Sequence, residues 1–199
     1  MPARDFEIVS PSTPPGLKLA YEIMTPREEA ELIELTQASG LSYYAYDAAN
    51  PRSSTSYGWK YDFSTDGFVA CAPLPEGLRA LAETAAAFAG VAPGDLAECL
   101  LNRYEPGAII QWHVDKPVWE HVVGVSLGAA AVMQFRKPTA DGYELACAEL
   151  LPRSMYLLSG EARHDFQHSL PPMQGTRWSI TFRSLSDEGR KLRDSLPAA

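Results

Sequence analysis

The sequence lacks the features that define several classes of protein. Its three cysteines, Cys71, Cys99 and Cys147, are an odd number without CxxC spacing, which argues against a disulfide framework and a structural zinc site. No apolar run reaches the roughly 18 residues of a membrane span, and the first residues show no apolar core of a signal peptide. We therefore expect a soluble, cytoplasmic protein with no membrane partner and with reduced thiols.

Positive charge is also scarce. Lys and Arg number 17 against 25 Asp and Glu, so the formal net charge is −8. This balance argues against a broad basic surface for nucleic acid, although a local basic lining could still bind a strand through a few phosphates. The composition, 46% hydrophobic and 21% charged, is that of a globular protein, and 199 residues suit one domain, which we expect to be monomeric.

Helix signals stand in the first half of the chain. The first helix is indicated by the residue types preferred at the N-cap, N1 and N3 positions, which are Thr25, Pro26 and Glu28. They predict a helix that ends at residues 39–40, and a second, alanine-rich helix is expected over residues 75–90. Before them lies an arm rich in Pro and Ser, with one short strand expected around Phe6 to Val9.

From residue 96 onward, short β-like runs follow one another. The runs are CLLNRY, AIIQW, HVVGVSL, AVMQFR, ELACAELL, SMYLLSG and RWSITFRSL. Seven closely spaced strands without helices between them predict an antiparallel sandwich or barrel, so the fold class is α+β and mainly β. Glu105-Pro106-Gly107 has the Pro and Gly of a type II turn, which we expect to fold the first two runs together.

Aromatic residues alternate in the segment SYGWKYDF, residues 56–63. One interpretation is a hairpin whose aromatic face packs on the core. The other is a lid over a cleft, in which Trp59 and Tyr61 stack a base while Arg52 and Lys60 bind phosphates.

A metal site is indicated by His113 and Asp115, which are separated by one residue. In an extended segment both would project from the same face, and a second histidine would complete the 2-His-1-carboxylate set typical of non-haem Fe(II). His168, between a strand and a Pro-Pro loop, is better placed for this than His164. The alternative is a structural histidine and aspartate at a strand end.

The last run, RWSITFR, puts Arg177, Ser179, Thr181 and Arg183 on one face if it is a strand. Two arginines pointing inward would be costly without carboxylate partners, which an anionic co-substrate would supply. The alternative is a pair of surface arginines on an edge strand.

Taken in order, these segments resemble the AlkB family of Fe(II)/2-oxoglutarate dioxygenases. The matching motifs, between residues 100 and 183, are N-x-Y-x-x-G, H-x-D, S-L-G, F-R, S-x-x-x-x-S-G, R-x-x-x-x-H and R-x-S-x-T-F-R. The resemblance implies a double-stranded β-helix (jelly roll) core with two N-terminal helices packed outside. It implies one domain over residues 1–199: arm, helices and lid in 1–95, catalytic core in 96–185 and a tail in 186–199.

The resemblance also assigns roles to residues. The implied iron ligands are His113, Asp115 and His168. The residues implied to bind 2-oxoglutarate, which is consumed together with O2, are Asn102, Tyr104, Arg177, Ser179 and Arg183. Trp59 and Tyr61 match aromatic positions of the family's nucleotide-recognition lid.

The implied activity is oxidative demethylation or hydroxylation, most often of alkylated nucleobases in single-stranded or unpaired DNA or RNA. One departure bears on the substrate. Lys116-Pro117 follows Asp115, whereas DNA-repair members carry an acidic residue two positions after the metal aspartate. The alternatives are an oxygenase acting on a protein side chain and a non-catalytic jelly-roll binding module.

Overall fold

The computed structural model describes residues 13–43 and 50–196, and the strand expected around Phe6 to Val9 lies outside them. The helices are α1 (Pro26–Ala38), α2 (Arg79–Ala89), α3 (Gly160–His164) and α4 (Asp187–Asp194), with 3-10 turns η1 (Glu76–Leu78) and η2 (Pro93–Asp95). None of these helices is both long and apolar enough to cross a membrane. The strands are β1 (Leu17–Ala20), β2 (Ser42–Tyr43), β3 (Arg52–Asp62), β4 (Gly67–Ala70), β5 (Leu96–Tyr104), β6 (Ile110–His113), β7 (Trp119–Gly128), β8 (Ala131–Thr139), β9 (Gly142–Leu150), β10 (Ser154–Leu158), β11 (Gln167–Leu170) and β12 (Arg177–Leu185).

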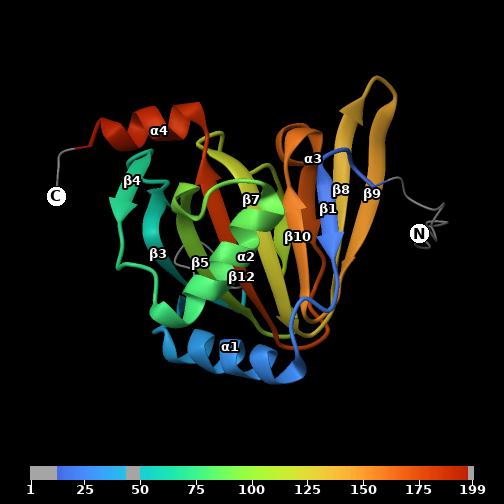
Figure 1. Ribbon diagram of the computed structural model, residues 1–199. Coiled ribbons are helices and arrows are strands. Elements are labelled where there is room, and N and C mark those ends of the chain that lie inside the picture. The colour runs from blue at the N-terminus through green and yellow to red at the C-terminus, as the bar shows by residue number, and fades with distance from the viewer. Residues whose placement is uncertain (1–12, 44–49, 197–199) are drawn as a thin grey trace.

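These strands form two antiparallel sheets around a common core (Figure 1). The larger sheet has the order β1-β10-β7-β12-β5-β3-β2, with β4 paired to β3, and the smaller has the order β6-β11-β8-β9. Val122 and Tyr156 of the larger sheet share a buried cluster with Phe135 and Leu170 of the smaller one, so the sheets face each other. The prediction of a mainly β, antiparallel architecture is confirmed.

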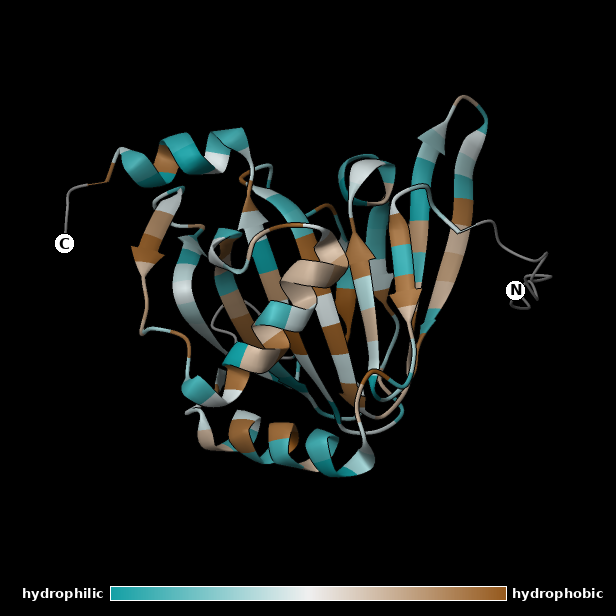
Figure 2. Cartoon of the chain, in the orientation of Figure 1, coloured by the Kyte–Doolittle hydropathy of each residue, from teal (hydrophilic) through white to brown (hydrophobic). Residues whose placement is uncertain are grey.

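A second buried cluster lies on the other face of the larger sheet. It joins Ala82 and Ala85 of α2 and Leu32 of α1 to Val123 and Val125 of β7. Because side chains alternate along a strand, β7 supplies Val122 to one cluster and Val123 to the other. Figure 2 shows hydrophobic residues, in brown, along the strands behind α2.

The start of α1 follows the predicted capping pattern. The Thr25 hydroxyl accepts a hydrogen bond from the Glu28 amide at 3.3 Å, and the Thr25 amide donates to the Glu28 carboxylate at 2.7 Å. This reciprocal pair satisfies two backbone donors that a helix start leaves without partners.

The turn at Glu105-Pro106-Gly107 is present, but the pairing expected from it is wrong. Gly107 has a φ of 87°, and the Ala108 amide donates to the Glu105 carbonyl at 3.0 Å. β5 nevertheless pairs with β3 and β12, whereas β6 pairs with β11 in the other sheet. The turn therefore passes the chain between sheets and does not close a hairpin.

Some elements gave no usable signal in the sequence. β11 and the five-residue helix α3 occupy a segment to which the sequence analysis assigned no helix or strand, and α4 occupies the expected tail. A strand of four residues and a helix of five are too short to display a periodicity, so only their neighbours define them.

A close contact in the larger sheet yields a stability prediction. Gly124 of β7 lies opposite Tyr156 of β10, and a Cβ at Gly124 would meet the tyrosine ring 2.1 Å away. We expect Gly124→Ala to lower the free energy of unfolding by about 1–3 kcal/mol, as overpacking does, in a urea titration. Gly94→Ala is the control, because a Cβ there meets nothing within 4 Å. Equal stability of the two variants would contradict the prediction.

Candidate active site

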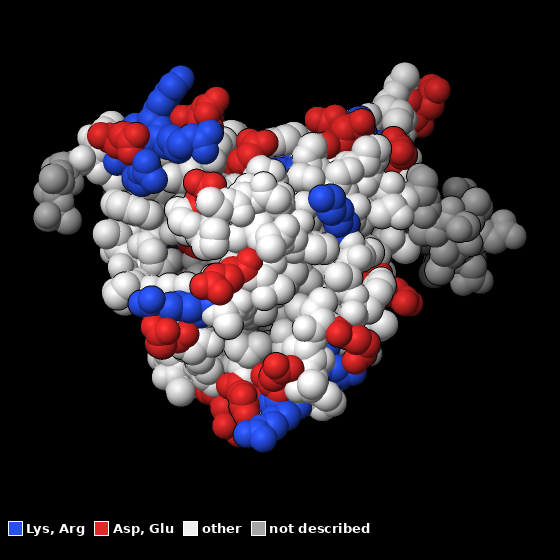
Figure 3. Space-filling model, in the orientation of Figure 1, with Lys and Arg blue, Asp and Glu red and all other residues white. Residues whose placement is uncertain are grey.

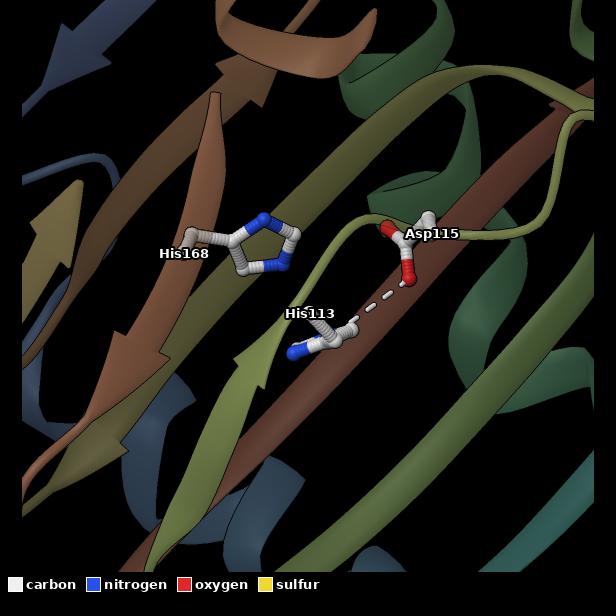
Figure 4. A group of neighbouring side chains, drawn as sticks. All are labelled: His113, Asp115 and His168. Atoms are coloured by element: carbon white, nitrogen blue, oxygen red, sulfur yellow. Dashed lines mark ion pairs between the residues drawn. The ribbon is translucent and has the colours of Figure 1, made fainter. Parts of the chain in front are cut away.

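The smaller sheet brings the three predicted metal ligands together. His113 ends β6 and lies directly opposite His168 of β11, while Asp115 follows β6 in the next loop. One ligand atom from each of the three side chains lies within 4.8 Å of the others, and Figure 4 shows the three side chains converging. His164 instead lies on α3, with its Nε2 3.6 Å from Glu120. The structure thus joins His168, and not His164, to the HxD pair.

His113 can offer Nε2 to a cation, and His168 and Asp115 have pKa values shifted in the direction that a cation requires. His113 Nδ1 lies 2.8 Å from the Gln111 carbonyl, so the tautomer that donates there leaves Nε2 as a ligand atom. Burial lowers the pKa of His168 to about 4, which keeps this imidazole neutral. Burial alone would raise the pKa of Asp115, but its neighbours, Arg183 first, hold that pKa well below its ordinary value. This donor set fits Fe(II).

Arg183 joins the metal aspartate to a carboxyl group that the sequence analysis did not select. Its Nη1 lies 2.7 Å from Glu98 Oε2, and its Nη2 lies 3.6 Å from Asp115 Oδ1. Burial would lower the pKa of Arg183, but Asp115 and Glu98 raise it above its ordinary value. The available signal was the even spacing of Glu98 from Asn102 and Tyr104, which puts all three on one face of β5.

The residues expected to bind 2-oxoglutarate lie on β5 and its neighbour β12. The register pairs Arg177 with Tyr104 and Ser179 with Asn102. Asn102 donates to Ser179 Oγ at 3.3 Å, and its own Oδ1 is buried without a hydrogen bond. The pairing of the two strands therefore explains why side chains from distant parts of the chain share one wall.

Arg177 is a buried cation without an ion-pair partner among the described residues. Its side chain is almost fully buried, at 1% exposure, and Nε donates to Ser126 Oγ at 3.0 Å. Nη2 is buried without a hydrogen bond, and the guanidinium lies 5.3 Å from the centre of the Tyr104 ring. An unpaired guanidinium of this kind fits a ligand carboxylate.

A cavity of about 920 Å³ contains the three predicted metal ligands. Its walls also include Asn102, Tyr104 and Arg183. Residues of β3 complete the lining. Arg177 and Ser179 lie behind this lining.

The four residues expected to contact substrate do not act as one face of β3. Arg52, Lys60 and Tyr61 line the cavity, whereas Trp59 does not and instead packs edge-on to Phe68 with 6.5 Å between ring centres. Even-numbered residues of a strand share a face, and odd-numbered ones share the opposite face. Tyr61 nevertheless lines the cavity although it shares the parity of Trp59, so parity alone does not separate the residues of β3 that face the cavity from those that pack.

Other aromatic residues reach the cavity from its rim. Phe63 is 55% exposed and Tyr43 is 76% exposed, and both line the cavity. Lys116 Nζ lies 5.5 Å from the Phe63 ring centre and 3.3 Å from Asp66 Oδ1, which connects the metal loop to the turn after β3. Phe63 is the last aromatic residue of the alternating segment. The pattern alone therefore did not distinguish it from the aromatic residues that pack on the core.

Comparisons with known proteins agree with this geometry. A family model described as the 2OG-Fe(II) oxygenase superfamily matches residues 27–186. The chain is 28% identical to the Xenopus tropicalis tRNA (carboxymethyluridine(34)-5-O)-methyltransferase alkbh8, over 83% of this chain and 27% of that protein. It is 31% identical to the Escherichia coli alpha-ketoglutarate-dependent dioxygenase AlkB, over 55% of each. The chain thus spans about a quarter of the length of the methyltransferase and half that of AlkB.

Solved structures share this fold. OsALKBH1 superposes with a TM-score of 0.66 at 18% identity, covering 87% of this chain and all of that one. A prolyl hydroxylase from Trichoplax adhaerens gives a TM-score of 0.62 at 13% identity, covering 92% of this chain and 88% of the other. At these identities the similarity concerns the fold alone.

Removal of a metal ligand tests the metal site. We expect His168→Ala to weaken Co(II) binding to the metal-free protein by more than about 100-fold, which exceeds the usual effect of losing an outer-shell partner. Calorimetric titration measures this affinity, and His164→Ala should bind Co(II) as the unaltered protein does. Weak binding by the His164 variant with normal binding by the His168 variant would contradict the assignment.

Arg177 allows a separate test of the anion site. Arg177→Met should weaken 2-oxoglutarate binding by about 2–5 kcal/mol, because it removes one partner of a desolvated ion pair. The control is Arg190→Met, which removes an exposed arginine that pairs with Asp187. Calorimetry with Mn(II)-loaded protein measures both, and an unchanged affinity in the Arg177 variant would rule out this role.

Proposed function

Because the chain belongs to the 2OG-Fe(II) oxygenase superfamily, we propose that it oxidises C–H bonds of modified nucleobases in unpaired nucleic acid. The chain is an AlkB-like, Fe(II)- and 2-oxoglutarate-dependent dioxygenase that consumes O2. We also propose that residues 1–199 act as one domain with its catalytic core in residues 96–185. A cytoplasmic location and a monomeric state stay predictions from the sequence.

The observation that carries the proposal is the 2-His-1-carboxylate set in a cavity that Arg183 lines, with the buried Arg177 behind that lining. His113, Asp115 and His168 would hold the iron, which supplies oxidation of the substrate coupled to decarboxylation of 2-oxoglutarate to succinate. The Arg177 guanidinium, which donates to Ser126 and packs on the Tyr104 ring, would pair with the distal carboxylate of 2-oxoglutarate. A non-catalytic binding module would not require these groups together.

The chain's own residues would contribute positioning and exclusion of water. Arg183 restrains the Asp115 carboxylate, and Glu98 compensates the charge of this arginine. Asp115 and His168 are largely buried, which strengthens the electrostatic interactions around them. Hydroxylation of an N-methyl group would release formaldehyde, whereas hydroxylation of a carbon substituent would leave a stable alcohol.

We propose nucleic acid as the substrate because of the names of the similar proteins and because of the residues at the rim of the cavity. One similar protein is named a tRNA methyltransferase and another is named AlkB. From them we infer only the class of substrate, which is nucleic acid. With a net charge of −8, long-range attraction to a polyanion is weak, and Figure 3 shows acidic residues among the basic ones on the face displayed. Arg52, Lys60 and Lys116 nevertheless line the cavity and could bind phosphates locally.

Base stacking at the rim is assigned to Phe63 in place of Trp59. Phe63 lines the cavity and is half exposed, whereas Trp59 packs against Phe68 outside the lining. An unpaired base avoids an unpairing cost of a few kcal/mol, so single strands and loops should be preferred over duplexes.

The substrate proposal is tested with a panel of alkylated DNA and RNA oligonucleotides. Phe63→Ala should lower kcat/KM by the value of one stacked base, about 1–3 kcal/mol, while the affinity for 2-oxoglutarate is retained. Trp59→Ala should lower thermal stability with a smaller effect on kcat/KM. The opposite pattern would restore Trp59 as the stacking residue. Succinate formation with a peptide but with none of the oligonucleotides would favour a protein substrate.

A further inference from the structure

Arg163 lies outside the cavity lining but contacts the loop that carries a metal ligand. We propose that Arg163 is a positioning residue that fixes the loop after β6, and with it Asp115, in the geometry that binds iron. This inference rests on the metal site and is independent of the substrate.

The hydrogen bonds of Arg163 all lead to the backbone of that loop and of the first residue of β7. Nη1 donates to the Asp115 carbonyl at 3.2 Å, and Nη2 donates to the carbonyls of Lys116 at 2.5 Å and Trp119 at 2.7 Å. The arginine is 1% exposed, so these bonds are shielded from water. One rigid, forked guanidinium thereby holds three carbonyl groups in a fixed relation.

The position of Arg163 in the fold couples this loop to the opposite side of the metal site. Arg163 belongs to α3, and the same segment continues into β11 with His168. The α3 segment is anchored in turn, because the Ala162 amide donates to the Pro15 carbonyl at 2.8 Å. The loop that carries Asp115 and the strand that carries His168 are therefore connected by the Arg163 side chain as well as by the pairing of β6 with β11.

The electrostatics identify Asp115 as the compensating anion. Arg163 forms no ion pair within residues 13–43 and 50–196. Burial, the largest influence, lowers the pKa of Arg163, and Asp115 is the first group that raises it. A buried cation held only by carbonyls is costly, so its placement beside the metal aspartate indicates a role there.

Asp115 is thus restrained from two directions. Arg163 holds its backbone carbonyl, and Arg183 lies 3.6 Å from its carboxylate. Loss of Arg163 should release the backbone of this residue while leaving all three metal ligands in the chain.

The test compares metal affinity with stability in Arg163→Met and Arg163→Lys. Each metal-free protein is titrated with Co(II) by calorimetry, and its thermal midpoint is measured with and without Co(II). We expect Arg163→Met to bind Co(II) about 10–100-fold more weakly, the usual effect of losing an outer-shell partner. Its Co(II)-induced rise in thermal midpoint should shrink accordingly, because that rise depends on the dissociation constant. Arg163→Lys keeps the charge and should lose less.

Arg153→Met is the matched control. Arg153 is also partly buried, but it bonds to Glu22 and Glu29, and we expect this variant to lose stability while it binds Co(II) normally. Co(II) affinities within twofold of the unaltered protein in both Arg163 variants would overturn the proposal. Failure of both to fold would also overturn it, because Arg163 would then serve the fold as a whole.

Discussion

The antiparallel pairing of β6 with β11 is the interaction on which the site depends. It puts His113 directly across from His168, although 54 positions separate them in the chain. A slip of one residue in either strand would turn its histidine to the opposite face. The register is held by the core below it, where Leu170 of β11 packs with Phe135 of β8. Packing of the smaller sheet thus determines whether a metal can be bound at all.

Buried charge around this pair follows from the same two-sheet arrangement. The larger sheet supplies Glu98, Arg177 and Arg183, the metal loop supplies Asp115, and α3 supplies Arg163. Three guanidinium groups against two carboxyl groups leave one positive charge in excess. In an interior of low dielectric such an excess is costly, and an anionic co-substrate can offset it. The anionic co-substrate would therefore offset part of the positive charge that the site and its cation carry together.

β3 shows how one strand serves two purposes. Its even-numbered residues, such as Arg52 and Lys60, face the cavity, while Trp59 on the other face packs with Phe68. Tyr61 also lines the cavity although it shares the parity of Trp59, so the strand contributes to both the packing and the cavity wall. The packing of Trp59 agrees with the hairpin interpretation, and the lid stays a prediction.

Local signals in the sequence determined what depends on local geometry. The capping box of α1, the turn at Gly107, the strand character of β5 and β12 and the choice of His113, Asp115 and Arg183 all follow from short spacings. Glu98 had only its even spacing from Asn102 and Tyr104 as a signal, and Arg163 stood only within the R-x-x-x-x-H motif. Neither role could be assigned from these signals, because the roles depend on partners 85 and 48 residues away. The turn after β5 illustrates the same limit, since its conformation is local but the sheet it enters is not. Which strands pair, and which face of a strand meets the cavity, was decided only by the packing of two sheets on a common core.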